Sequence, residues 1–115
     1  MLDILGELNR VRGVGGSLLF NADGLLMESA LRSDADEQGL AAAAGNLIAQ
    51  TSRMCEQLGI GRQNAFSASG EQGGVMIAAA GAGTLLILLD PSSNLALLRL
   101  EVRPFTDRIA QRLTL

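Results

Sequence analysis

The sequence contains no histidine, lysine, tryptophan or tyrosine, and its only cysteine is Cys55. Histidine is the commonest general base near neutral pH, and lysine supplies Schiff-base and phosphate-loop chemistry. A Ser-His-Asp triad, a histidine-containing zinc site and a Walker A nucleotide loop are therefore excluded. One cysteine cannot form an internal disulfide. The composition predicts a protein that is not an enzyme, with no catalytic residue, no metal site and no cofactor.

Charge is sparse as well, because charged residues make up 18% of the 115 residues and the formal net charge is -3. The nine basic residues are all arginines, scattered from Arg10 to Arg112 without a run. Binding along a phosphate backbone needs clustered positive charge, so nucleic acid is not an expected partner. The length and the 48% apolar content predict a single folded domain over residues 1–115.

One uncharged stretch, residues 73–89, is about as long as the shortest membrane spans. Gly81-Ala82-Gly83 divides it into two runs of strand length, which indicates a buried hairpin rather than a membrane helix. The first seven residues lack the basic region and long apolar core of a signal peptide. We therefore expect a cytoplasmic protein that does not insert into a membrane.

Apolar periodicity and turn residues predict three helices and five strands. Residues 2–11 are apolar at every third position, which is typical of a short amphipathic helix. The Asp23-Gly24 pair joins two predicted strands as a hairpin. A long helix is expected from its N-cap at Asp34 to Leu58, and Pro104 is expected to kink or briefly interrupt the last helix. The predicted strands are residues 14–20, 25–29, 64–69, 74–80 and 84–90, and the last helix begins at residue 95.

The predicted order is therefore α-β-β-α-β-β-β-α. The connections are short, and all neighbouring strands except those joined by the long helix can form antiparallel hairpins. The simplest closure is an α/β fold in which helices sandwich a five-stranded antiparallel sheet.

Three residue groups allow both a chemical and a structural interpretation. Gly13–Ser17 is glycine-rich like a phosphate loop, but it follows a helix and enters a strand, so a turn with close backbone approach is favoured. Asp34, Asp36 and Glu37 could bind a cation, although capping of the long helix explains them without one. Cys55 has no histidine or lysine to activate it and is interpreted as a packed or interfacial residue.

The long helix carries two unusual surfaces. Leu40 to Gly45 contains a run of small residues that would let another backbone approach closely, either its own sheet or a partner helix. Asn46, Gln50, Arg53 and Gln57 form a separate polar stripe, which is either a solvated face or a partner surface.

Residues 64–69 are small and polar for a central strand and predict a sheet edge. Neither proline nor a charged residue lies between Arg62 and Glu71, so the devices that usually protect an edge are missing. Such an edge favours pairing with a second copy of the chain in a symmetric dimer.

Together these features resemble the roadblock (dynein light chain roadblock) family. The resemblance rests on the segment Val14 to Leu26, on the alanine-rich long helix and on the apolar hairpin Val75 to Leu89 before a final helix. It covers essentially the whole chain, and the family includes the bacterial gliding-motility (MglB-like) members, which regulate small GTPases.

The resemblance implies a homodimer with a continuous ten-stranded sheet and side-by-side long helices that form a platform for a Ras-like small GTPase. The implied platform residues are Asn46, Gln50, Arg53 and Gln57. The expected dimer interface comprises Leu40, Ala44, Ile48, Ala65, Phe66, Ser67 and Ala68. Two alternatives remain open: a structural adaptor of a signalling or motor complex that senses no nucleotide, and a ligand-binding α/β domain. Replacing Ala44 with arginine is expected to separate the dimer, or to unfold the chain if Ala44 lies in the core.

Overall fold

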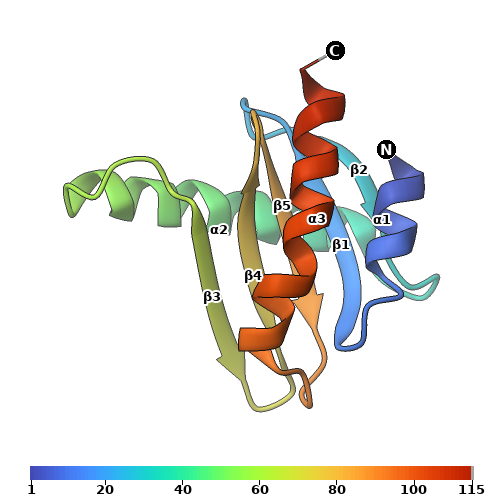
Figure 1. The fold of residues 1–115 in the computed structure, drawn as a ribbon. Helices are drawn as coiled ribbons and strands as arrows, with labels where there is room; N and C mark the ends of the chain where they lie inside the picture. Colours follow the sequence, from blue (N-terminus) through green and yellow to red (C-terminus); the bar gives the residue numbers. More distant parts are fainter. Residues whose placement is uncertain (115) are drawn as a thin grey trace.

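In the computed structural model, which describes residues 1–114, helices cover both faces of a five-stranded antiparallel sheet (Figure 1). The elements are α1 (Leu2–Leu8), β1 (Val14–Phe20), β2 (Leu26–Ala30), α2 (Glu37–Gln57), β3 (Ala65–Gly70), β4 (Gly73–Ala80), β5 (Gly83–Leu89) and α3 (Leu95–Leu113). The strand order is β2-β1-β5-β4-β3, and every neighbouring pair is antiparallel. The predicted fold class and element order are confirmed.

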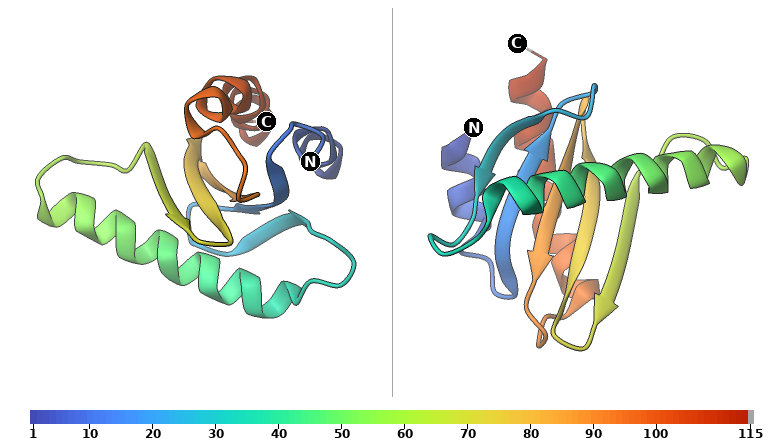
Figure 2. Two further views of the ribbon diagram at one scale, coloured as in Figure 1. Left: turned by 90° about the horizontal axis from the view of Figure 1, so that it is seen from below. Right: turned by 180° about the vertical axis from the view of Figure 1, so that it is seen from behind.

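The helices form two layers, with α1 and α3 on one face of the sheet and α2 alone on the other (Figure 2). Alternate residues of each strand point to opposite faces. On β5, for example, Leu85 and Ile87 belong to the core beneath α1 and α3, whereas Leu86 belongs to the smaller core beneath α2. The unequal size of the two cores follows from this arrangement, because one helix covers less of the sheet than two.

The uncharged stretch forms β4 and β5, which pair over their whole length inside the sheet. None of the described helices is long and apolar enough to cross a membrane. The glycine-rich segment is a turn that leads into β1, as predicted. Gly13 has a φ of +97°, and a Cβ built there would lie 2.9 Å from the Cβ of Ser93, so close backbone approach explains the glycine.

Two predicted helix boundaries are wrong. The first helix ends at Leu8 rather than at residue 11, because the Asn9 side chain donates to the Ala30 carbonyl and accepts from Ser17. The long helix is capped by Asp36 rather than Asp34, since the Asp36 carboxylate accepts from the Gly39 backbone N–H. The first error comes from a contact between residues far apart in the chain, whereas the second is a choice between two local capping residues.

Pro104 lies inside α3 without interrupting it, contrary to the interruption that the sequence predicted. The proline is exposed, and the buried residues Val102 and Ile109 on either side of it hold the helix against the sheet. Loss of one backbone donor on the solvent side is offset by this packing.

Helix α2 is longer than the sheet is wide, so its C-terminal end extends past the last strand, β3 (Figure 2). At this end, Met54 is 41% exposed and the C-cap residue Leu58 is 65% exposed. Both continue, at helical spacing, the apolar stripe of the helix, which consists of Leu40, Ala44, Leu47, Thr51, Met54 and Leu58. Ile60, in the following loop, is 67% exposed. We refer to Met54, Leu58 and Ile60 as the α2 overhang.

Candidate functional site

The four residues of the polar stripe, Asn46, Gln50, Arg53 and Gln57, all lie exposed on α2. Their spacing places them on one side of the helix, away from the buried residues Ala44, Thr51 and Cys55. The structure therefore provides a continuous polar surface along the helix. Its role as a platform for a partner stays a prediction.

The small residues of α2 are divided between two faces. Ala41 and Ala44 pack against the core beneath the helix, and a Cβ on Gly45 would lie 3.7 Å from the Phe20 ring. Ala42 and Ala43 are exposed. Packing on the sheet thus explains part of the run, and the rest remains available to a partner. Ala44 is only 6% exposed, so an arginine there is expected to unfold the protomer instead of separating a dimer.

Strand β3 is an edge of the sheet, as predicted. The Ala79 backbone N–H donates to the Asn64 carbonyl, and hydrogen-bonded positions alternate along an antiparallel pair. The backbone groups of Ala65, Ser67 and Ser69 therefore point away from β4, toward the open side of the edge. Of the predicted interface residues on this strand, Ala65 and Ala68 are exposed, while Phe66 and Ser67 are half-buried.

The opposite edge, β2, is protected in several ways. It has five residues, a register shift opposite Leu19 and Phe20, and a charged residue, Glu28. The Asn9 side chain also occupies the carbonyl of its last residue, Ala30. Short length, bulges and charge are the usual means of blocking edge pairing. Of the two edges, β3 is the one open to another strand.

An apolar groove runs between α2 and the sheet on the side of the helix away from the β4–β5 turn. Its volume is about 150 Å³, and its lining is Leu18, Leu40, Ala43, Ala44, Leu47, Val75, Leu86 and Leu88. Leu40, predicted at the dimer interface, lies here, whereas Ile48 lies on the other side of the helix. The groove and the α2 overhang are both unpartnered apolar surfaces on the same face of the sheet.

A larger and more polar cleft, of about 550 Å³, lies on the other side of α2 between the β1–β2 turn and Arg62 and Gln63. The Gln63 amide donates to Ser52 Oγ at 3.4 Å, and its Oε1 is buried without a partner. Because that oxygen is sealed from the cleft, it cannot bind a ligand held there. The cleft is a less convincing site than the surfaces above.

The acidic cluster at the start of α2 is engaged in separate contacts. Asp36 caps the helix, Glu37 accepts from Ser29 Oγ at 2.8 Å, and Asp34 lies 3.4 Å from Arg32. Among the described residues, no group of three or more potential ligands is placed to hold a metal ion. Capping thus explains Asp36, whereas Asp34 and Glu37 have other partners. Cys55 is buried in the packing of the helix, as predicted.

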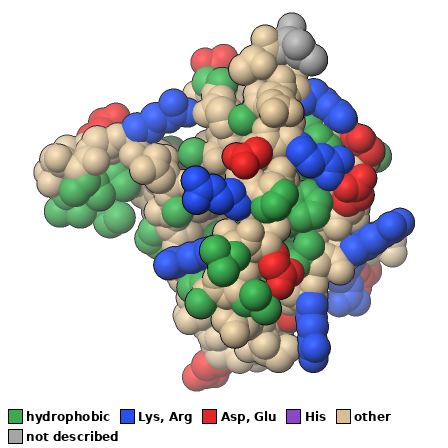
Figure 3. All heavy atoms as spheres, viewed as in Figure 1, with side chains coloured by type: hydrophobic (Ala, Val, Ile, Leu, Met, Phe, Trp, Pro, Cys, Tyr) green, Lys and Arg blue, Asp and Glu red, His purple; other side chains and the backbone are tan. Residues whose placement is uncertain are grey.

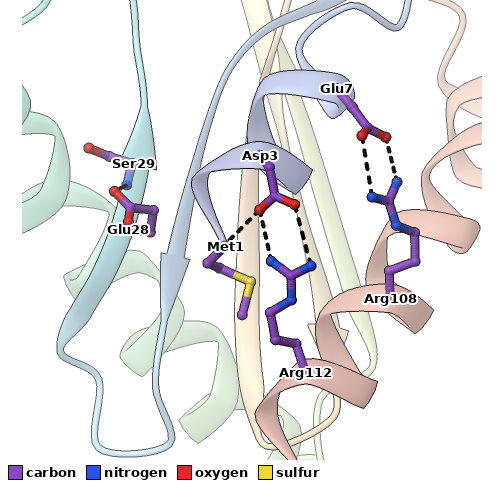
Figure 4. A network of polar contacts seen from close by, with 7 residues as sticks. All are labelled: Met1, Asp3, Glu7, Glu28, Ser29, Arg108 and Arg112. Atoms are coloured by element: carbon purple, nitrogen blue, oxygen red, sulfur yellow. Dashed lines mark hydrogen bonds and ion pairs between the residues drawn. The ribbon is translucent and has the colours of Figure 1, made fainter.

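Sequence analysis missed two ion pairs that join the ends of the chain (Figure 4). Arg108 contacts Glu7 at 2.6 Å, and Arg112 contacts Asp3 at 2.8 Å, each through two nitrogens. Arg112, helped by the N-terminal ammonium, holds the pKa of Asp3 well below its ordinary value, and Arg108 lowers the pKa of Glu7. The matching four-residue spacing of the acids and the arginines was the available signal.

Comparisons with known proteins agree with this geometry. The Roadblock/LC7 domain model matches residues 1–90. An uncharacterised protein of Methanocaldococcus jannaschii is 32% identical over 110 residues, which are 95% of this chain and 96% of that protein, and a second one is 33% identical over 95% and 93%.

Among solved structures, Myxococcus xanthus MglB has a TM-score of 0.86 at 18% identity and covers 97% of this chain and 93% of its own. A roadblock/LC7 domain from Streptomyces avermitilis has the same TM-score and identity and covers 100% and 98%. The gliding protein MglB from Thermus thermophilus has a TM-score of 0.79 at 22% identity, with coverage of 96% and 85%. At these identities the likeness establishes the fold.

Proposed function

Because this chain belongs to the Roadblock/LC7 domain family, we propose that it is a non-catalytic homodimer that docks a Ras-like small GTPase on its paired α2 helices. The α2 overhang carries the proposal, since an isolated protomer leaves three large apolar side chains without a partner.

The proposed dimer forms through the open edge β3. Its outward backbone groups belong to Ala65, Ser67 and Ser69, so an antiparallel pair makes the most hydrogen bonds when the two-fold axis passes through Ser67. In that register Phe66 of one protomer lies opposite Ala68 of its partner. A large side chain then packs beside a small one, which supports this register.

The same two-fold axis would also place the α2 overhang of each protomer against its partner. Figure 2 shows that α2 crosses the sheet near the end at which β3 begins. Rotation about Ser67 carries the partner's α2 toward the other end of β3, on the side that holds Val75 and Leu88 of the apolar groove. Met54 and Leu58 of each protomer would then cover the groove of the other, removing both apolar surfaces from water.

The two antiparallel α2 helices would present their polar stripes together on one face of the dimer. Asn46, Gln50, Arg53 and Gln57 offer amide donors and acceptors and one cation, a mixture suited to a hydrated protein interface. A surface of this kind supports docking of a folded partner without chemistry. A structural adaptor would use the same surface but would ignore the nucleotide on its partner.

The register is testable by cross-linking. We expect Ser67→Cys to form an intermolecular disulfide under mild oxidation, because the two Ser67 residues face each other across the axis. The wild-type chain, whose Cys55 is buried, and Glu71→Cys at the exposed β3–β4 turn are the controls. Equal cross-linking of Glu71→Cys, or none at Ser67→Cys, would contradict the register.

The function is tested by calorimetric titration with the small GTPase encoded nearest to this chain, loaded in turn with a GTP analogue and with GDP. We expect preferential binding of the GTP form, and at least an about tenfold loss of affinity for the double variant Gln50→Ala and Arg53→Ala. Gln111→Ala, on the exposed face of α3, is the matched control. Equal binding of both forms would identify an adaptor, and absence of binding would rule out this GTPase as the partner.

A further inference from the structure

We infer that the outer face of α3 is a second docking surface, which takes an acidic amphipathic helix from another protein. The surface is the α3 ridge, defined as Leu97, Leu100 and Pro104 with Arg99 and Arg103 beside them. It lies on the sheet face opposite α2, so it is separate from the proposed platform. The matched family model ends at residue 90, before α3 begins.

The ridge is apolar at its centre. Leu97 is 50% exposed and Leu100 is 72% exposed, and the spacing of three residues puts them next to each other on the helix, with Pro104 following one turn later. Figure 3 shows hydrophobic side chains gathered over the N-terminal half of α3, with basic side chains on one side of them and acidic side chains on the other. Single exposed leucines need no explanation, but neighbouring ones at the centre of a helix face indicate a contact surface.

The helix cannot turn to bury these leucines. Leu98 and Val102, on its inner side, are each 2% exposed, and Ile109 is fully buried. The two bidentate pairs with α1 fix the other half of the helix. The ridge is therefore a rigid surface presented to solvent, and a partner that binds it does not have to order it first.

The charges beside the ridge select the partner. Arg99 donates only to the neutral Ser67 Oγ, at 3.3 Å, and Arg103 forms no ion pair within the part of the chain that the structure describes. Glu101 lies one turn after Leu97 on the opposite flank of the ridge, in a hollow that Leu97 and Arg12 also line, and Asp107 lies one turn beyond Arg103. One flank of the ridge is thus positive in a chain whose net charge is -3, which favours an acidic partner.

A helix fits this surface better than a membrane does. A row of side chains at helical spacing packs into the groove of a second helix, and such partners bind through a few apolar anchors. Anionic lipid would have to accept a chain that is negative as a whole, anchored by only two leucines. We therefore assign the surface to a helical protein segment with leucines on one face and acidic residues beside them.

Fluorescence anisotropy with a labelled amphipathic helical peptide, carrying leucines on one face and glutamates on its flanks, tests the inference. We expect saturable binding, and at least an about tenfold weaker affinity for Leu100→Ser. The double variant Arg99→Glu and Arg103→Glu should instead prefer the same peptide with lysines in place of glutamates. This exchange of preference separates recognition from a general loss of folding.

Leu25→Ser and Arg32→Glu, at an exposed leucine and an exposed arginine outside α3, are the matched controls and should bind the glutamate peptide like the wild type. The inference is overturned if neither peptide binds, if Leu100→Ser binds normally, or if Leu25→Ser abolishes binding. The inference is also overturned if the protein binds neither peptide but co-sediments with phosphatidylserine vesicles, and Leu100→Ser abolishes the co-sedimentation. That result would assign the ridge to lipid. This test uses no GTPase, so its outcome does not depend on the proposed GTPase binding.

Discussion

Among single residues, Asn9 connects three consecutive elements, α1, β1 and β2. Its amide donates to the Ala30 carbonyl of β2 at 2.8 Å, and its oxygen accepts from the Ser17 hydroxyl of β1 at 2.9 Å. Ser17 is fully buried, so its hydroxyl depends on this partner. Asn9 thereby ends α1 and fastens it to the protected edge of the sheet.

We expect Asn9→Ala to lower the free energy of unfolding by about 1–3 kcal/mol, because a buried hydroxyl and a strand carbonyl both lose their partner. Urea denaturation monitored by circular dichroism measures the change. Asn46→Ala, on the exposed face of α2, is the matched control and should change stability by less than about 0.5 kcal/mol. If the two substitutions lowered the free energy of unfolding equally, the proposed role of Asn9 would be wrong.

Among the elements, α1 and α3 are linked directly by two ion pairs between their side chains. The ion pair Glu7–Arg108 joins residues that are 101 positions apart in the sequence, and the pair Asp3–Arg112 joins residues that are 109 positions apart. The side chains of all four are about half exposed, so solvent screens these pairs and their measured contribution should be salt-sensitive.

The lowered pKa values of Asp3 and Glu7 give stability a definite pH dependence. A carboxyl whose pKa is lower in the folded state stabilises the fold above its unfolded pKa and loses that contribution as pH falls through the folded value. We therefore expect the free energy of unfolding to decline as pH falls below the ordinary values of 4.5 for Glu7 and 3.8 for Asp3. Denaturant titrations at stepped pH measure it.

The double variant Arg108→Gln and Arg112→Gln should show a flatter decline over the same pH range, because it removes the main cause of both shifts. High salt should flatten the wild-type curve in the same way. An unchanged slope in both experiments would mean that the two pairs do not couple α1 to α3 in solution.

For the whole molecule, the unequal covering of the two sheet faces is the property with the largest consequence. The face under α1 and α3 is covered by two helices, and among the described residues its core is the larger of the two. The face under α2 is open on one side of the helix, and the helix itself extends past the sheet. A second copy that contributes one more α2 would complete this face, which is the physical basis of the proposed dimer.

We expect light scattering to give about twice the chain mass of 12.0 kDa at micromolar concentration, the range in which stable homodimers form. Leu58→Ser should shift the mass toward that of one chain, because it removes an apolar side chain that the partner would bury. Leu25→Ser is the matched control, since Leu25 and Leu58 are both 65% exposed but Leu25 lies at the other end of the sheet. A single-chain mass for the wild type would refute the dimer.

The sequence alone determined the order of elements and the family. Turn residues such as Asp23-Gly24 and the helical spacing of apolar residues are local signals, and local signals define helices and hairpins. The small and polar residues of 64–69 also identified an edge strand correctly. The polar stripe on α2 was visible for the same reason, since residues of one helix face recur at a fixed spacing.

Only the tertiary structure decided which residues are free to contact a partner. Ala44 and Leu58 belong to the same apolar stripe of α2, yet Ala44 is buried in the protomer and Leu58 lies beyond the sheet. The exposed leucines of α3 and the ion pairs with α1 likewise depend on where that helix rests. Helical spacing fixes the side of a helix on which a residue lies, whereas burial depends on what lies opposite that side, and this is set by contacts between residues far apart in the chain.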